Sequence, residues 1–152
     1  MNNKRKLLML TFLAFASASL NAQSGPIAID LRPLQSEPGS AKKVELTLRS
    51  RQLVKFPCSD VSRIRIYVYK PDGSLAQDTA EGSKLKEEQS TPQSHSSVCV
   101  SNTMKPGQSV KQDIDVGNLY EMDASGTYRV KAELDLPDGS TARSSLISIQ
   151  VR

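Results

Sequence analysis

The sequence predicts an all-β protein, an antiparallel β-sandwich of about seven strands. Short segments in which apolar and polar residues alternate recur along the chain, and turns rich in Pro, Gly, Asp and Ser separate them. Residues 105–136 contain a Pro-Gly turn, an alternating segment, a short apolar crossing and a second alternating segment. That order is typical of a chain that passes from one sheet of a sandwich to the other.

The strands can be placed in chain order. Two of them are followed by Pro-Asp-Gly-Ser turns at 71–74 and 137–140, in which Pro sets the first φ angle and Gly takes a positive one. The pair Leu146-Ile147 breaks the alternation of the last strand and indicates a bulge. The expected strands cover residues 27–33, 44–49, 64–69, 98–104, 109–116 and 128–136, with a final strand that ends at residue 151.

Residues 1–22 have the composition of a secretory signal peptide. Lys4, Arg5 and Lys6 form its positive end, and an apolar run and small residues follow. The apolar run covers only 7–15, whereas a membrane-spanning helix needs about 20 residues. We expect cleavage after Ala22, with Ala18 as the alternative. Residues 23–152 are therefore expected to form a single periplasmic or secreted β-sandwich domain that is not inserted in a membrane.

The charge of this mature chain is nearly balanced. Three of the 20 basic residues lie in the signal segment, which leaves 17 basic residues against 16 acidic ones. Basic residues gather at 49–55 and 63–65, but the acidic residues Glu45, Asp60 and Asp72 are interspersed with them, which is typical of a solvated face of mixed charge. The sequence therefore predicts no nucleic-acid partner.

Cys58 and Cys99 are the only cysteines. In an oxidising compartment, two such residues are expected to pair, and closing a loop of about 40 residues stabilises a fold by about 4 kcal/mol. The alternatives are a reactive thiol or a metal pair. Neither cysteine belongs to a Cys-x-x-Cys motif, and His95 is the only other soft ligand nearby, so we predict a structural disulfide.

Residues 77–97 differ in composition from the rest of the mature chain. They are mostly Ser, Glu, Lys, Gln and Thr, and Leu85 is their only large apolar residue. Such a segment buries too little apolar surface to form a core element. We therefore expect a long polar loop at 77–97.

The folding motifs resemble those of a known class of domain. Residues 46–48, 64–73, 106–109 and 114–130 together resemble an immunoglobulin-like exported accessory domain. They are similar to the amino-terminal domains of deuterolysin-like metallopeptidases and, more weakly, to BsuPI-type proteinase inhibitors. The resemblance implies an immunoglobulin-like antiparallel β-sandwich. It does not imply peptidase activity, because the sequence holds no His-Glu-x-x-His zinc motif.

No catalytic, cofactor or metal-binding residue is assigned, and the chain is not expected to be an enzyme. A Ser-His-Asp arrangement would have to use His95, which lies in the polar segment with nothing to hold its geometry. Calcium is the least implausible metal, because Asp113 with Asp115, or Asp135 with Asp138, pair oxygen ligands at short spacing. Alternating carboxylates on a strand, however, are usually its solvated face.

The leading hypothesis is an exported, non-enzymatic module that binds or inhibits a protein partner such as a peptidase. Its candidate surface combines the 77–97 loop with Lys55, Phe56 and Pro57, where Phe56 is expected to be an exposed apolar anchor beside the disulfide. The alternative is a carbohydrate- or calcium-binding sandwich. Tyr67 and Tyr69, which share one strand face, are the second candidate surface because aromatic rings stack on sugars.

Overall fold

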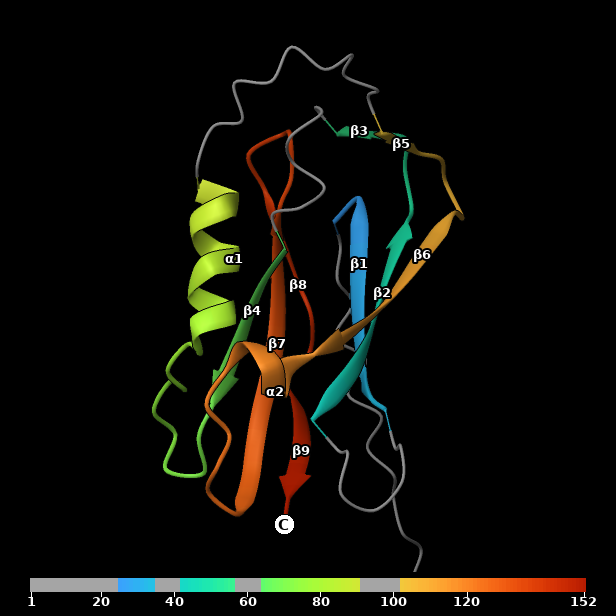
Figure 1. Ribbon diagram of the computed structural model, residues 1–152. Helices are drawn as coiled ribbons and strands as arrows, with labels where there is room; N and C mark the ends of the chain where they lie inside the picture. The colour runs from blue at the N-terminus through green and yellow to red at the C-terminus, as the bar shows by residue number, and fades with distance from the viewer. Residues whose placement is uncertain (1–24, 35–41, 57–63, 91–101) are drawn as a thin grey trace, which may run out of the picture.

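Two antiparallel sheets make up the body of the protein (Figure 1). The computed structural model describes residues 25–34, 42–56, 64–90 and 102–152. The elements in these ranges are β1 (Ile27–Pro33), β2 (Lys43–Ser50), β3 (Val54–Phe56), β4 (Ile64–Tyr69), α1 (Ala80–Ser90), β5 (Asn102–Met104), β6 (Ser109–Asp115), α2 (Val116–Leu119), β7 (Gly126–Asp135), β8 (Thr141–Arg143) and β9 (Ile147–Val151).

The order of strands divides these elements into three groups. One sheet, the β2 sheet, has the order β1-β2-β6. The other, the β7 sheet, has β4 on one side of β7, and β8 and β9 on the other side. β3 and β5 pair separately at one end of the molecule (Figure 1). The predicted all-β, antiparallel β-sandwich is thereby confirmed.

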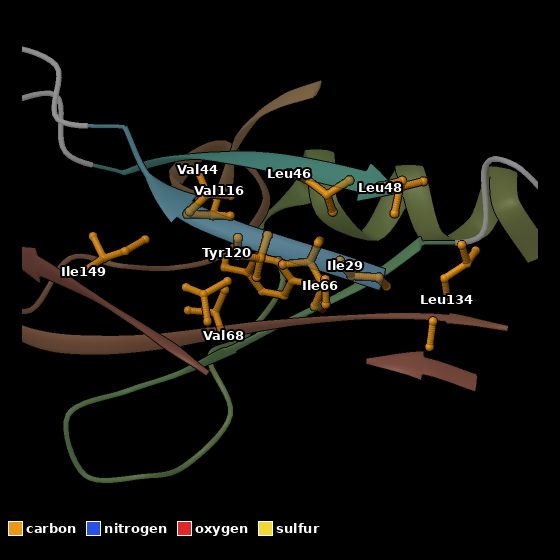
Figure 2. Close-up of a cluster of buried hydrophobic side chains, with 14 of the residues drawn as sticks. Ile29, Val44, Leu46, Leu48, Ile66, Val68, Val116, Tyr120, Leu134 and Ile149 are labelled. Carbon is orange, nitrogen blue, oxygen red and sulfur yellow. Dashed lines mark hydrogen bonds between the residues drawn. The ribbon is translucent and has the colours of Figure 1, made fainter. Parts of the chain in front are cut away.

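The core lies between the two sheets. Strand β7 turns Tyr128, Val130, Ala132 and Leu134 inward, and each of these side chains is at most 1% exposed. Burying each large apolar side chain stabilises the fold by about 1.5–3 kcal/mol, which is why the alternation of these residues fixes the strand and its inward face. Figure 2 shows side chains of β1 and β2, among them Ile29 and Leu46, in the same cluster as side chains from the β7 sheet.

The chain passes from one sheet to the other where the sequence predicts it. β6 ends in the β2 sheet, and the four-residue helix α2 and a short segment then lead to β7. The Asp115 carboxylate caps α2 by accepting a hydrogen bond from the Asn118 N–H at 3.2 Å. Val116 and Tyr120 from this crossing are buried between the sheets (Figure 2). Within the described ranges, neither helix is long and apolar enough to cross a membrane.

The predicted bulge lies in the last part of the chain. Three residues, Ser144 to Leu146, stand opposite only two residues of β7, Lys131 and Ala132. The extra residue divides the predicted final strand into β8 and β9. The side chain of Ser144 accepts a hydrogen bond from the Ala132 N–H at 2.8 Å, which satisfies the backbone at the break.

Both Pro-Asp-Gly-Ser turns form as predicted. In the first, the Asp72 carboxylate accepts hydrogen bonds from the backbone and the side chain of Ser74, and these bonds lower the pKa of Asp72. Gly73 has a φ of 86°, which a residue with a side chain rarely adopts. The second turn repeats this arrangement with Asp138 and Ser140.

Candidate functional site

A groove of about 300 Å³ lies between helix α1 and strand β4. Residues 64–67 of β4 form one wall, and Gly82, Leu85 and Lys86 of α1 form the other. Leu119 and Tyr120, from the crossing between the sheets, complete the lining. We call this the α1–β4 groove. In Figure 1, α1 stands beside β4, which is the outermost strand of the β7 sheet.

The helix that forms one wall was not expected. The predicted loop at 77–97 is wrong for residues 80–90, which form α1, and residues 91–97 lie outside the described residues. The loop was predicted because the segment is polar, and α1 indeed has no apolar stripe at the helical period, since Leu85 is its only large apolar residue. Residues with high helix propensity, such as Glu, Lys and Gln, stabilise the helix instead. Thr79 caps its start, since the Thr79 hydroxyl accepts a hydrogen bond from the Gly82 N–H at 3.1 Å.

The first turn of α1 is fixed to the crossing between the sheets. The Thr79 N–H donates to the Leu119 carbonyl at 3.0 Å, and the Glu121 N–H donates to the Gln77 carbonyl at 2.9 Å. A Cβ atom at Gly82 would lie 2.1 Å from the Leu119 carbonyl oxygen, so only glycine allows this approach. Leu85, which follows in the next turn, is 39% exposed and lines the groove.

Successive residues of β4 point their backbone N–H and C=O groups alternately toward β7 and toward the groove. The Val68 carbonyl accepts a hydrogen bond from the Ala76 N–H, and the Ile66 carbonyl accepts one from the Tyr120 hydroxyl. Neither donor belongs to β7, so both carbonyls point away from that strand. Because every second residue of a strand points its N–H and C=O to the same side, those of Ile64 also face this edge. The edge of β4 therefore presents backbone N–H and C=O groups to the groove, with the spacing found in a β-strand.

Only part of this edge is open. Beyond Val68 the chain covers it, because Tyr69 pairs with Leu75 and the Lys70 N–H donates to the Ser74 carbonyl at 2.8 Å. Among the described residues, β7 is the only strand paired with residues 64–67. The accessible edge is thus a short stretch that coincides with the groove.

The two charged side chains that line the groove are both cations. Arg65 forms two hydrogen bonds with the Asp135 carboxylate, at 2.6 and 2.8 Å, and these bonds lower the pKa of Asp135. Lys86 forms hydrogen bonds with Asp78 at 2.6 and 2.8 Å, and its Nζ lies 5.3 Å from the ring centroid of Tyr120. Both cations keep about half of their side-chain surface exposed, at 45% and 53%.

Tyr120 forms the inner part of the groove. Its ring is buried, and its hydroxyl donates to the Ile66 carbonyl. Burial, with a smaller contribution from the nearby Asp78 carboxylate, raises the pKa of Tyr120 to about 12. The hydroxyl therefore stays protonated at neutral pH and acts as a fixed donor.

The predicted surface around Phe56 is partly wrong. Phe56 is 2% exposed and belongs to the core. Its side chain points inward from β3, as that of Val54 does, whereas the side chain of Lys55 between them points outward. It cannot serve as an exposed anchor. Pro57, Cys58 and Cys99 lie outside the described residues, so the disulfide stays a prediction. The last described pair of β3 and β5, Phe56 with Asn102, lies close in sequence to both cysteines.

Tyr67 and Tyr69 share the outer face of β4, as their spacing predicts, and both are half-buried. The Lys131 Nζ lies 4.8 Å from the ring centroid of Tyr67 and 6.0 Å from that of Tyr69, and the Arg129 guanidinium lies 6.0 Å from the latter. These cations occupy positions over the rings that a stacked sugar would need. Tyr67 also reaches the α1–β4 groove. A role for either residue in binding remains a prediction.

Three of the four carboxylates considered for calcium, Asp115, Asp135 and Asp138, have structural partners. Asp115 caps α2, Asp135 binds Arg65 and accepts a hydrogen bond from Thr141, and Asp138 stabilises its own turn. In the described part of the chain, no group of three or more His, Cys, Asp or Glu residues is placed to hold a metal ion.

The chain was compared with protein families, curated proteins and solved structures. No family model matches it. No curated protein matches it either. Among solved structures, it is similar to the archaellum periplasmic stator protein complex FlaF and FlaG from Sulfolobus acidocaldarius, with 18% identity and a TM-score of 0.39 over 91% of this chain and 100% of that one. So weak a likeness carries no inference about function, and no match supports the resemblance to deuterolysin-like or BsuPI-type proteins.

Proposed function

We propose that this chain is an exported, non-enzymatic module that binds a protein partner, and that the α1–β4 groove is the docking site. Export is supported by the signal-peptide pattern of residues 1–22. The observation that carries the docking site is the coincidence of an open sheet edge with an apolar groove. No other feature of the described residues combines backbone and side-chain groups for recognition in this way.

The composition of the groove suits a protein ligand. Ile64, Leu85 and Leu119 supply apolar surface, and Arg65 and Lys86 flank it with charge. Protein interfaces commonly have such an apolar centre with a polar rim. An unpaired strand edge is in addition a ready template for the backbone of another chain.

Partner binding is a better interpretation than peptidase inhibition. The inhibitor hypothesis predicted that a loop at 77–97 enters a peptidase cleft, and residues 80–90 form a helix instead. The surface predicted for partner binding or inhibition also included Phe56 as an exposed anchor, and Phe56 is buried. We therefore propose docking into a groove of this chain, not insertion of a loop of this chain into a partner.

The test is affinity capture with the groove open and blocked. The mature chain is immobilised and exposed to the exported proteins of its source organism, beside a Leu85→Trp variant in which the indole fills the groove. Leu53→Trp is the matched control, because Leu53 is 58% exposed and lies between β2 and β3, outside the groove lining. Circular dichroism verifies that both variants fold.

We expect one or more proteins to be captured by the wild type and by Leu53→Trp, and to be lost with Leu85→Trp. If the Leu85→Trp variant retains the same proteins in the same amounts, the α1–β4 groove is not the docking site.

A further inference from the structure

We infer that the partner enters the α1–β4 groove as an extended segment that adds a strand to β4 and places an acidic side chain between Arg65 and Lys86. This inference rests on the proposed function and specifies the chemistry of the partner. Three features of the groove lead to it: the direction of the β4 backbone, the position of α1, and the sign of the lining charges.

The backbone of β4 supplies the first argument. Ile64 and Ile66 point their backbone groups away from β7, and the Ile66 carbonyl, already bonded to Tyr120, has a second lone pair. Groups on alternate residues of a strand match the spacing of the groups on an added strand, in which each residue advances about 3.3 Å. A sugar or a lipid has no backbone with this repeat. The edge is therefore complementary to an extended peptide.

Helix α1 supplies the second argument. It contacts the body through its first turn, where Gly82 meets Leu119, and its next turn places Leu85 in the lining of the groove, which also includes Ile64. An added strand would thus lie with β4 on one side and a helix on the other. Its side chains alternate in direction, so that every second one can contact Leu85 and the apolar lining. This arrangement favours a segment with apolar residues at alternate positions.

The charges supply the third argument. Arg65 and Lys86 come from opposite walls, and none of the described residues that line the groove is acidic. The carboxylates that bind these two cations lie outside the described lining and hold the cations in place: Asp135 and, at 3.8 Å, Glu133 for Arg65, and Asp78 for Lys86. About half of each cationic side chain remains exposed and can bind a further carboxylate. The groove is therefore complementary to a segment that carries Asp or Glu and disfavours one rich in Lys or Arg.

The experiment selects peptides from a library of short random sequences displayed on phage, with the mature wild-type chain as bait. Enriched sequences are synthesised with a fluorescent label, and their dissociation constants are measured by fluorescence anisotropy. Each peptide is also made with N-methyl groups on alternate residues, in both possible phases. N-methylation removes the N–H donors without changing any side chain, so it separates strand addition from binding by side chains alone.

We expect the enriched peptides to combine apolar or β-branched residues with at least one Asp or Glu. One phase of N-methylation should weaken binding by about tenfold or more, and the other phase by much less, because only one set of N–H groups faces β4. Equal effects of the two phases, or no enrichment of any peptide, would overturn strand addition.

Two pairs of protein variants test the edge and the charge. Ile64→Pro removes a donor at the strand edge, and Ile64→Val keeps it, so we expect binding to fall about fivefold only with proline. Lys86→Gln and Lys84→Gln each remove one positive charge from α1, but only Lys86 lines the groove. Lys86→Gln should weaken binding of acidic peptides by about threefold while Lys84→Gln leaves it unchanged. If the two Ile64 variants bind the peptides equally well, the edge of β4 does not bind the peptide backbone. If the two lysine variants do so, Lys86 does not bind the acidic side chain.

Failure of strand addition and failure of the docking site give different results. If groove-dependent capture of a partner succeeds and the peptide measurements fail, the partner docks by another mode and the strand-addition inference is wrong. If Leu85→Trp has no effect on capture, the docking site itself is wrong.

Discussion

At the scale of single residues, Tyr120 links the crossing segment to the edge of β4 that faces the α1–β4 groove. Its buried hydroxyl satisfies the Ile66 carbonyl, and its ring lies under Lys86 of α1. One side chain therefore contacts the strand, the helix and the groove. Changes to this side chain should therefore lower the stability of the fold more than they weaken the binding of a partner.

We expect Tyr120→Phe to lower the free energy of unfolding by about 1 kcal/mol at neutral pH, because it leaves the Ile66 carbonyl without its donor. The wild type should also lose stability between pH 10 and 12. The pKa of Tyr120 is about 12 in the folded chain and near 10 when unfolded, so in this interval the unfolded chain has released the proton and the folded chain retains it.

The free energy of unfolding therefore falls as pH rises through this interval, by up to about 1.4 kcal/mol per pH unit. Urea unfolding of both proteins between pH 8 and 11 measures this, and Tyr120→Phe should show a shallower decline. Identical slopes would mean that Tyr120 does not carry the alkaline sensitivity.

At the scale of elements, α1 depends on one close approach. Gly→Ala inside a helix ordinarily stabilises it by about 1 kcal/mol. At Gly82 we expect the opposite sign, because the added Cβ would lie 2.1 Å from the Leu119 carbonyl oxygen, a backbone atom that cannot rotate away. Ser83→Ala, one residue further in the same helix, is the control.

Thermal unfolding followed by circular dichroism provides the measurement. Gly82→Ala should lower the melting temperature or reduce the helical signal, whereas Ser83→Ala should leave both unchanged or raise them slightly. A more stable Gly82→Ala variant would show that α1 is not held against Leu119.

The two walls of the groove differed in how far the sequence could predict them. β4 was predicted because Ile66 and Val68 alternate with partly exposed residues, and burial of one face of a sheet enforces that pattern. α1 was missed because it makes its main contact through a glycine, which leaves no apolar stripe to detect. Thr79 followed by a run of helix formers was the available signal. The contact with Leu119 depends on the tertiary fold and leaves no local pattern.

At the scale of the whole molecule, the division into two sheets followed from the sequence because residues 105–136 hold both strands and the crossing that joins them. The candidate site did not follow, because it needs α1, β4 and the crossing to meet in space. Phe56 illustrates the same limit. Its strand has only three residues, too few for alternation to show which side chain is buried.

The predicted disulfide between Cys58 and Cys99 also belongs to this scale. We expect the mature chain purified from an oxidising compartment to lack free thiols and to have a mass two hydrogens below that of the reduced chain. Reduction should lower the free energy of unfolding by about 4 kcal/mol, because the unfolded chain regains the freedom of the closed loop. A chain with both cysteines changed to serine is the control, and reductant should not alter its stability. Two reactive thiols in the oxidised preparation would contradict the prediction.

The most direct test of the docking site is amide hydrogen exchange of the mature chain, resolved by residue with NMR, before and after binding. The amides of Arg65 and Tyr67 face β7 and should exchange slowly in both states. The amides of Ile64 and Ile66 face the groove and should exchange faster in the free chain, then become protected when the captured partner or a selected peptide is bound. Protection of Ile66 equal to that of Arg65 in the free chain would mean that the edge is already occupied, and that the α1–β4 groove is not an open docking site.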